Sequence, residues 1–192
     1  MMPNALVLLS NGCEETEAVT TIDLLTRAGI DVTYASITEE REVLCSRGVA
    51  LLAQKTFSQV KSLQYDAVVL PGGVKGAENF RDSAQVIEKL KQTYEKGKVV
   101  AAICATPAMV LQHHNLFPNA KMTGFPTTKE AFKLWQDERA YYDDAHRILT
   151  SQGPATSIDF ALKIIEVLVS KAKAAEVASG LVLPDGINDY RH

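Results

Sequence analysis

Five consecutive apolar residues, Val99–Ile103, place the strongest constraint on how this chain folds. A strand with one face in water alternates polar and apolar side chains, and this run does not alternate. Both faces of the strand must therefore be covered, which is typical of central strands in parallel sheets that carry helices on both sides. We predict a buried strand over Lys98–Cys104.

Short apolar runs and longer helical stretches alternate along the rest of the chain. Further strands are predicted at Ala5–Leu9, Val32–Ile37, Ala67–Leu70 and Arg147–Thr150. Helices are predicted at Glu14–Ala28, Ser83–Lys96, Ala105–His113, Thr156–Ser170 and Lys171–Ser179. The alternation predicts an α/β fold with an open parallel sheet between two layers of helices. The segment Val43–Leu52 predicts a small β-hairpin outside that sheet.

Composition narrows the class of protein. The 192 residues show no repeat, linker or low-complexity tract, so we predict one domain over residues 1–192. A net charge of −3 without a basic stripe gives no reason to expect specific nucleic-acid binding. The apolar run at 5–9 is too short for a signal peptide or a membrane span. Three widely spaced cysteines make neither a disulfide framework nor a zinc site, so we expect no metal and a reducing, cytoplasmic location.

Three segments with unusual chemistry leave predicted strands at the same edge of the sheet. They are Gly12–Glu17, Pro71–Gly76 and Cys104–Pro107. Ligands of open parallel sheets bind beyond the carboxyl ends of the strands, near a switch in strand order. We therefore expect these segments to meet at one rim and to form the functional site.

Cys104 is the first candidate in this site. An immediate change from strand to helix puts its side chain on a sharp turn, as in the nucleophile elbows of other α/β enzymes. The N-terminus of the following helix favours a thiolate over a thiol. The alternative is a small buried hydrophobic residue that ends an apolar strand.

Glu17 is the second candidate. Glu14 and Glu15 fall in the first turn of a helix, where the helix dipole explains acidic residues. Glu17 lies further in, at the edge of the apolar face, where burial would raise its pKa and let it hold or donate a proton. The alternative is a solvated acid at the start of a helix.

Gly72 and Gly73 form the third candidate feature. Paired glycines after a strand allow positive φ and a close approach of the backbone. The N–H groups of Gly73 and Ala105 together would make an oxyanion hole beside Cys104. The alternative is an ordinary tight turn. The segment has neither the glycine spacing of a dinucleotide site nor the Lys-Ser/Thr of a phosphate loop.

Other residues carry weaker signals. Cys13 is either a second reactive thiol or a surface-loop cysteine, and Cys45 belongs to the predicted hairpin, where a subunit contact is one interpretation. We interpret the pair His113-His114 as solvated at a helix end, and Trp135 as a packing residue.

Five motifs occur together in one order: Glu14-Glu15-Thr16-Glu17, Cys45-Ser46-Arg47, Leu70-Pro71-Gly72-Gly73, Ala101-Ala102-Ile103-Cys104-Ala105 and Leu149-Thr150-Ser151-Gln152-Gly153-Pro154. In this the chain resembles the ThiJ/PfpI superfamily over nearly its whole length. The resemblance is closest to the branch of bacterial YajL and the parkinsonism-associated deglycase.

The resemblance implies a flavodoxin-like three-layer sandwich, a homodimer, and no metal or organic cofactor. It implies that Cys104 is a nucleophile, that Glu17 is a protonated partner of its sulfur, and that Gly73 and Ala105 are backbone donors. It also places Arg27 and Arg47 at an anion site near the dimer contact.

Two positions depart from patterns in the superfamily. Several relatives have a histidine near the nucleophile where this chain has Phe125, so a Cys–His dyad is absent there. Relatives of the peptidase type have histidine directly after the cysteine, where this chain has Ala105, so we do not expect peptidase activity.

These observations predict cofactor-independent processing of reactive dicarbonyls, or of their early adducts on proteins and nucleotides, in the manner of a glyoxalase or deglycase under oxidative stress. The alternative is a redox sensor or oxidation-regulated chaperone that uses the same cysteine without turnover.

Overall fold

A seven-stranded sheet forms the centre of the computed structural model, which describes residues 2–184. The strand order is β5-β2-β1-β6-β7-β9-β8, and every neighbouring pair is parallel except β8 with β9. The strands of this sheet are β1 (Asn4–Leu9), β2 (Asp31–Ser36), β5 (Lys55–Thr56), β6 (Ala67–Leu70), β7 (Val99–Ile103), β8 (Ala140–Asp143) and β9 (Ile148–Ser151).

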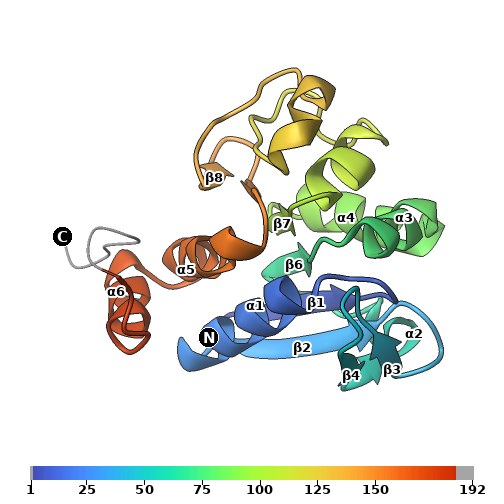
Figure 1. Cartoon of the computed structure of the whole chain (residues 1–192), viewed down its shortest axis with the longest axis horizontal. Helices are drawn as coiled ribbons and strands as arrows, with labels where there is room; N and C mark the ends of the chain where they lie inside the picture. The colour runs from blue at the N-terminus through green and yellow to red at the C-terminus, as the bar shows by residue number, and fades with distance from the viewer. Residues whose placement is uncertain (1, 185–192) are drawn as a thin grey trace.

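Helices cover both faces of the sheet (Figure 1). One apolar cluster joins the sheet to α1 (Glu15–Arg27), α5 (Ser157–Leu168) and α6 (Lys171–Ser179). A second cluster joins the other face to α2 (Phe57–Val60), α3 (Val74–Asp82), α4 (Ala84–Glu95) and the π-helix η1 (Pro107–Gln112). This arrangement confirms the predicted flavodoxin-like three-layer sandwich with a mostly parallel sheet.

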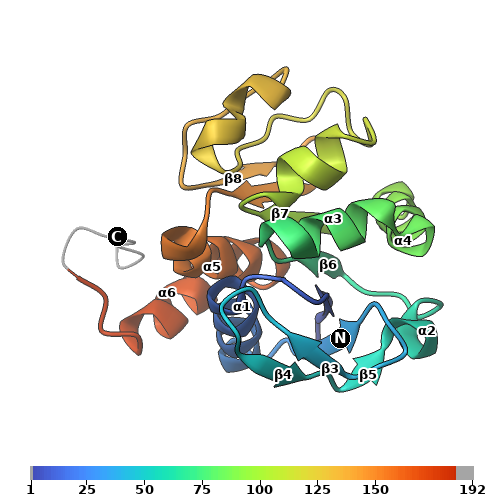
Figure 2. The same cartoon turned by 45° about the vertical axis from the view of Figure 1, so that its right-hand side comes forward.

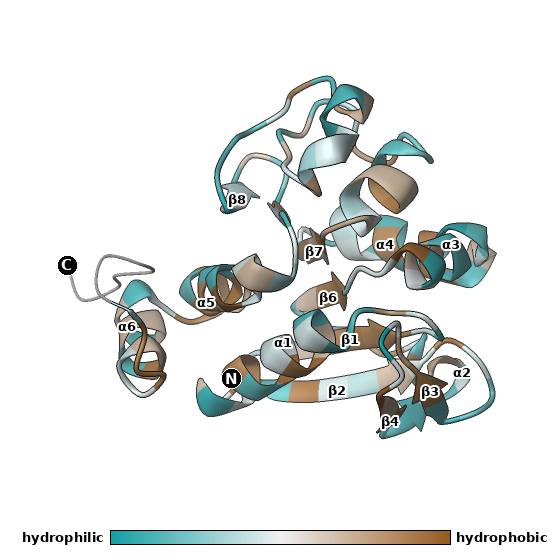
Figure 3. Ribbon diagram, in the orientation of Figure 1, coloured by the Kyte–Doolittle hydropathy of each residue, from teal (hydrophilic) through white to brown (hydrophobic). Residues whose placement is uncertain are grey.

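The central strands are apolar on both faces because both faces are buried. Along β1, Ala5, Val7 and Leu9 belong to one cluster, and Leu6 and Leu8 belong to the other. All five residues of β7 are buried, as the unbroken apolar run predicts. Figure 3 shows these strands in the brown of hydrophobic residues. No helix within residues 2–184 is long and apolar enough to cross a membrane.

All five predicted strands are present, and four of the five predicted helices are α-helices with slightly different ends. The helix predicted over Ala105–His113 is instead the six-residue π-helix η1. The helices α2 and α3 and the strands β5 and β8 were not predicted from the sequence. Strand β8 pairs at the edge of the sheet and its first three residues are half-buried, so it lacks the apolar pattern of a central strand.

The predicted hairpin is confirmed. Strands β3 (Glu42–Leu44) and β4 (Ala50–Leu52) pair antiparallel outside the main sheet. Figure 2 shows this hairpin beside α1. The Gly12 N–H donates to the Leu44 carbonyl at 2.8 Å, so the hairpin is tied to the loop after β1. It thereby forms one side of the rim where β1, β6 and β7 end.

Strand order reverses between β1 and β6. From β1 the chain proceeds outward to β2 in one direction, and from β6 to β7 in the other. The carboxyl ends of these strands therefore open a crevice at the predicted rim. The remaining short helical turns there are η2 (Pro126–Ala131) and η3 (Pro154–Thr156).

Candidate active site

Cys104 lies on the sharp turn that ends β7. Its φ is +65°, in the left-handed region that costs a non-glycine residue about 1–3 kcal/mol. Its N–H donates to the Ser151 carbonyl at 3.0 Å, and its carbonyl accepts the Phe125 N–H at 2.8 Å. Hydrogen bonds on both sides thus hold the strained residue, which is half-buried and lines a pocket. This confirms the predicted sharp turn.

Gly72 and Gly73 bring the loop between β6 and α3 against this turn. A Cβ atom on Gly72 would lie 2.5 Å from the Cys104 Cβ and 2.7 Å from Glu17 Oε2. Gly73 has a φ of +85°, and a Cβ atom there would overlap the carbonyl oxygen of Gly12. Neither residue can carry a side chain unless the loop moves away from the sulfur. The interpretation of these glycines as an ordinary tight turn is therefore incomplete, because they also allow the loop to pack closely against Cys104 and Glu17.

Two backbone N–H groups, those of Gly73 and Ala105, lie close enough to the Cys104 sulfur to lower the pKa of its thiol. They come from different loops, one after β6 and one after β7. The structure thus brings together the two donors that the sequence predicts for an oxyanion hole. Their catalytic role stays a prediction.

Glu17 is fully buried beside this sulfur, in the first turn of α1. Its Oε2 accepts the Gly72 N–H at 2.6 Å, whereas Oε1 has no hydrogen-bond partner among residues 2–184. Burial raises the pKa of Glu17 to about 7, and the Gly72 N–H offsets part of that effect. The interpretation of Glu17 as a solvated acid is therefore wrong, and the inward-facing carboxyl is confirmed.

The expected low pKa of Cys104 does not follow from the helix terminus alone. Burial and the negative charge of an ionised Glu17 raise the pKa of the Cys104 thiol to about 12, against the lowering by its two N–H donors. The following helix η1 is a single short π-helix, so its dipole is weak. The thiol and the carboxyl therefore titrate as a coupled pair, which loses its first proton near pH 7 and then holds one negative charge.

Solvation decides which of the two groups carries that charge. A sulfur anion has two N–H donors and some contact with solvent. A Glu17 carboxylate has one N–H donor and no contact with solvent. A proton on Oε1 would also remove the charge from a buried oxygen that has no hydrogen-bond partner. These differences favour a Cys104 thiolate beside a protonated Glu17.

Thr106 links the two loops that supply the N–H donors. Its side chain is fully buried, and its hydroxyl lies 2.8 Å from the Pro71 carbonyl and 2.9 Å from the Ile103 carbonyl. The first contact bridges the turn after β7 to the loop that carries Gly73. No role for Thr106 was predicted from the sequence, in which its place directly after Ala105 is the one signal that points to the site.

A pocket of about 860 Å³ opens above the sulfur. Its apolar wall includes Leu44, Met109 and Phe125, and Phe125 is 40% exposed. Phe125 thus presents a hydrocarbon surface to this pocket, with no group that could act as a base. Among residues 2–184, no cluster of three or more His, Cys, Asp or Glu side chains could hold a metal ion.

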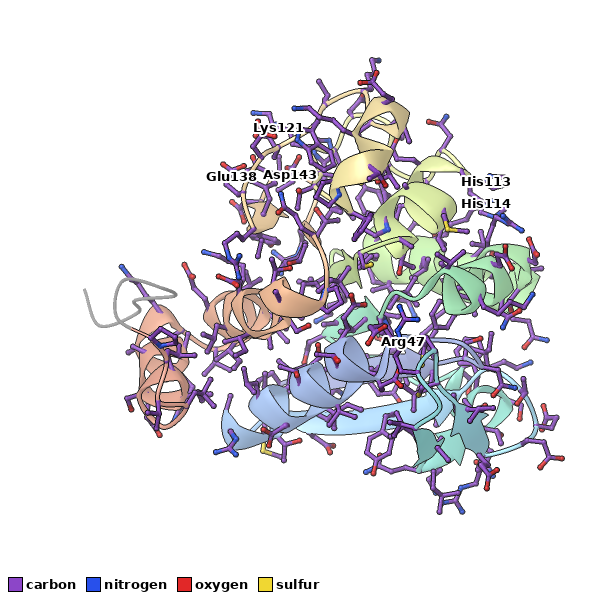
Figure 4. All side chains as sticks on the ribbon, in the orientation of Figure 1. Arg47, His113, His114, Lys121, Glu138 and Asp143 are labelled. Carbon is purple, nitrogen blue, oxygen red and sulfur yellow. The ribbon has the colours of Figure 1, made fainter. Side chains whose placement is uncertain are left out.

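The two arginines lie in different places. Arg47 lines the pocket, and Figure 4 shows it where the hairpin meets the start of α1. Among residues 2–184 its guanidinium has no ion-pair partner. Arg27 ends α1 and pairs with Asp23 at 3.1 Å on an exposed face. Arg27 does not line this pocket, and its place at an anion site stays a prediction.

Glu14 and Glu15 do more than complement a helix dipole. The Ser46 hydroxyl lies 2.8 Å from Glu14 Oε2 and 2.9 Å from Glu15 Oε2. The Arg47 N–H donates to Glu15 Oε1 at 2.8 Å. These acids therefore fasten the hairpin over the site. This function was not predicted because nothing local in the sequence pairs residues more than thirty positions apart.

The remaining cysteines are both buried. Cys13 is 0% exposed, so the surface-loop interpretation is wrong. Cys45 is 5% exposed within its own chain, which leaves little of its surface for a subunit contact.

His113 and His114 are exposed, as predicted, and Figure 4 shows them away from Arg47. Trp135 packs edge-on against Phe132, with ring centroids 5.2 Å apart.

A pH series of alkylation tests the charge assignment. We expect Cys104 to react with iodoacetamide at a rate that rises to a plateau with an inflection at or below about pH 7, the pKa of Glu17. Digestion and mass spectrometry separate its modification from that of Cys13 and Cys45. A rate that still climbs above about pH 9 would put the proton on sulfur and the charge on Glu17.

Residues 3–167 match the DJ-1/PfpI family. Protein dj-1beta of Drosophila melanogaster is 39% identical over 186 residues, which cover 95% of this chain and 98% of the relative. The glutathione-independent glyoxalase DJR-1.2 of Caenorhabditis elegans is 32% identical over 185 residues, with 94% and 96% covered. The crystal structure of VC2308 protein superposes with a TM-score of 0.93 at 38% identity, over 96% of this chain and 95% of that one. The chain therefore belongs to the DJ-1/PfpI family.

Proposed function

We propose that this protein converts reactive dicarbonyls, or their early adducts, to hydroxy acids without a cofactor. The observation that carries the proposal is the contact of the Cys104 sulfur with two N–H donors and a buried carboxyl at the floor of a pocket. A relative named as a glutathione-independent glyoxalase supports this chemistry. Deglycation of proteins or nucleotides would extend the same chemistry to larger substrates.

The first step joins the substrate to sulfur. The Cys104 thiolate attacks the aldehyde carbon, and the carbonyl electron pair moves to oxygen. The Gly73 and Ala105 N–H groups stabilise the resulting alkoxide. Glu17 then gives its proton to that oxygen, which leaves a hemithioacetal and a Glu17 carboxylate.

The second step moves two protons within the adduct, one after the other. The Glu17 carboxylate removes the hydrogen from the former aldehyde carbon and gives it to the ketone oxygen, which forms an enediol. It then takes the hydroxyl proton of the former aldehyde oxygen and delivers it to the neighbouring carbon. The aldehyde carbon becomes a thioester as the ketone carbon is reduced to an alcohol, so no external oxidant is needed. Water hydrolyses the thioester, which releases a hydroxy acid and the Cys104 thiol.

The pocket supports substrates larger than free dicarbonyls. Its volume of about 860 Å³ lies in the range of sites for drug-sized ligands. Arg47 offers a cation without an ion-pair partner among the described residues, which suits an adduct that bears a carboxylate or phosphate. We therefore favour anionic adducts alongside small dicarbonyls.

The redox-sensing and chaperone alternative uses the same sulfur. A sensor needs a thiolate that peroxide reaches readily. A Cys104 thiolate would meet that need as well, so sensing and turnover can coexist. The relative named as a glutathione-independent glyoxalase favours turnover. The stress response and the cytoplasmic location stay predictions.

Two substitutions test the mechanism. We expect Cys104→Ser to lower kcat/KM for methylglyoxal at least about 10³-fold, because the serine hydroxyl is a far weaker nucleophile. Glu17→Gln should lower it about 10²- to 10⁴-fold, because an amide cannot relay the proton. Cys13→Ser, a buried cysteine outside the pocket, is the matched control and should keep near-normal turnover. Unimpaired turnover in both site variants would end the proposal.

Thr106→Val tests how the N–H donors are held. Valine keeps the shape of threonine but cannot donate to the Pro71 carbonyl, so the two donors lose their common anchor. We expect kcat to fall roughly ten- to a hundredfold with little change in KM, and Thr106→Ser to restore it. A valine variant with normal kcat, or a serine variant as impaired as valine, contradicts this role.

A second copy of the chain is the partner that the hairpin surface supports. Three large apolar side chains of the hairpin are exposed: Leu44 at 58%, Val49 at 47% and Leu52 at 65%. Apolar residues that gather on one surface element are typical of protein–protein contacts. We therefore place the contact of the proposed homodimer at the hairpin.

Sedimentation equilibrium tests this contact. We expect the wild-type protein to be a dimer and Leu52→Glu to be a monomer, because the contact would bury an unpaired carboxylate. Leu63→Glu, at a side chain 52% exposed in another part of the chain, is the matched control and should remain a dimer. A monomeric wild-type protein, or a dimeric Leu52→Glu variant, would refute the assignment.

A further inference from the structure

Cys13 and Cys45 form a buried pair of thiols outside the chemistry proposed above. Their sulfur atoms lie 3.7 Å apart, although the residues are 32 positions apart in the sequence. Cys13 belongs to the loop after β1, and Cys45 follows β3 of the hairpin. Both sulfurs are free thiols, so two reduced cysteines are in van der Waals contact.

The backbone on both sides of the pair fixes this contact. The Gly12 N–H donates to the Leu44 carbonyl at 2.8 Å, and the Ser46 N–H donates to the Cys13 carbonyl at 2.8 Å. The two segments therefore cannot drift apart while these bonds hold. A disulfide needs a sulfur separation of about 2.05 Å. The two sulfurs must therefore approach by a further distance of about 1.6 Å (3.7 Å less about 2.05 Å).

The two sulfurs differ in access. Cys45 lines the same pocket as Cys104, whereas Cys13 lies behind it with no exposed surface. A small oxidant in the pocket therefore reaches Cys45 first and finds Cys13 in position to complete a bond. Burial raises the pKa of both thiols, so both are protonated and reaction requires an oxidant held in the pocket beside Cys45.

We propose that Cys13 and Cys45 form a reversible disulfide when a hydroperoxide enters the pocket. The Cys45 sulfur attacks the terminal peroxide oxygen, the O–O bond breaks, and a sulfenic acid forms as water or an alcohol leaves. The Cys13 sulfur then attacks the Cys45 sulfur, and the S–S bond forms as a second water leaves with the Cys13 proton. The two thiols give up two electrons, which reduce the peroxide.

This disulfide would tie the hairpin to the start of α1. The hairpin carries Ser46 and Arg47, and the start of α1 carries the acids that Ser46 and the Arg47 backbone contact. The tie would fix one wall of the pocket in the presence of peroxide. The state of this wall would then depend on redox conditions, independently of any oxidation of Cys104.

Intact mass and thiol counting test the disulfide in a Cys104→Ser background, which removes the third cysteine. After treatment with hydrogen peroxide, we expect the protein to lose two hydrogen atoms and both alkylatable thiols, and dithiothreitol to restore them. A Cys13→Ser/Cys104→Ser double variant keeps only Cys45 and should show no loss of two hydrogen atoms, because its sulfenic acid has no second thiol to condense with. A gain of oxygen in place of the hydrogen loss, a cross-link between two chains, or two thiols that stay alkylatable would overturn the proposal.

Thermal unfolding gives a second readout. A new link across 32 positions constrains the unfolded chain, so the oxidised Cys104→Ser protein should unfold roughly 5 °C or more above its reduced form. The double variant corrects for oxidation elsewhere and should show no rise. Equal unfolding temperatures for the oxidised and reduced forms would contradict the predicted tie.

Discussion

The burial of one carboxyl group beside one sulfur is the constraint on which the rest of the site depends. Glu17 has no contact with solvent and a single N–H donor, so an anion there is poorly stabilised. The adjacent sulfur has two N–H donors and partial access to water. The negative charge therefore resides on the sulfur, because the buried carboxylate would be less well stabilised. No cation within residues 2–184 is among the causes of either pKa shift.

This constraint explains several features that look unrelated in the sequence. Gly72 must lack a side chain because the carboxyl and the cysteine Cβ both occupy the space where one would go. Cys104 must adopt a positive φ so that its sulfur faces the loop after β6. Thr106 holds that loop at a set distance from the turn. Segments that end β1, β6 and β7 meet only because parallel strands bring their carboxyl ends to one edge.

The sequence predicted the parts of the structure that depend on local pattern. Apolar runs located β1, β2, β6, β7 and β9, and the change from strand to helix located the turn at Cys104. Contacts between distant segments could not be predicted from the sequence. The fastening of Ser46 to Glu14 and Glu15, and the contact of Cys13 with Cys45, join positions more than thirty residues apart that carry no shared local signal. The sequence also assigned the thiolate of Cys104 to a helix N-terminus, whereas the helix that follows is a short π-helix and burial raises the pKa of the thiol.

The site has one acid, Glu17, and the residue at position 125 is a phenylalanine rather than a histidine. This limits how protons can move. Its exposed ring lines the pocket near Cys104, where it can neither accept nor donate a proton. Every proton that the proposed reaction moves must then pass through Glu17, which has to give its proton before it can remove one from carbon. An apolar wall also lowers the local dielectric, which strengthens the attraction between the alkoxide and its two N–H donors. Because there is no histidine base at position 125, Glu17 must act first as an acid and then as a base. The apolar ring of Phe125 assists the first step, in which the alkoxide forms.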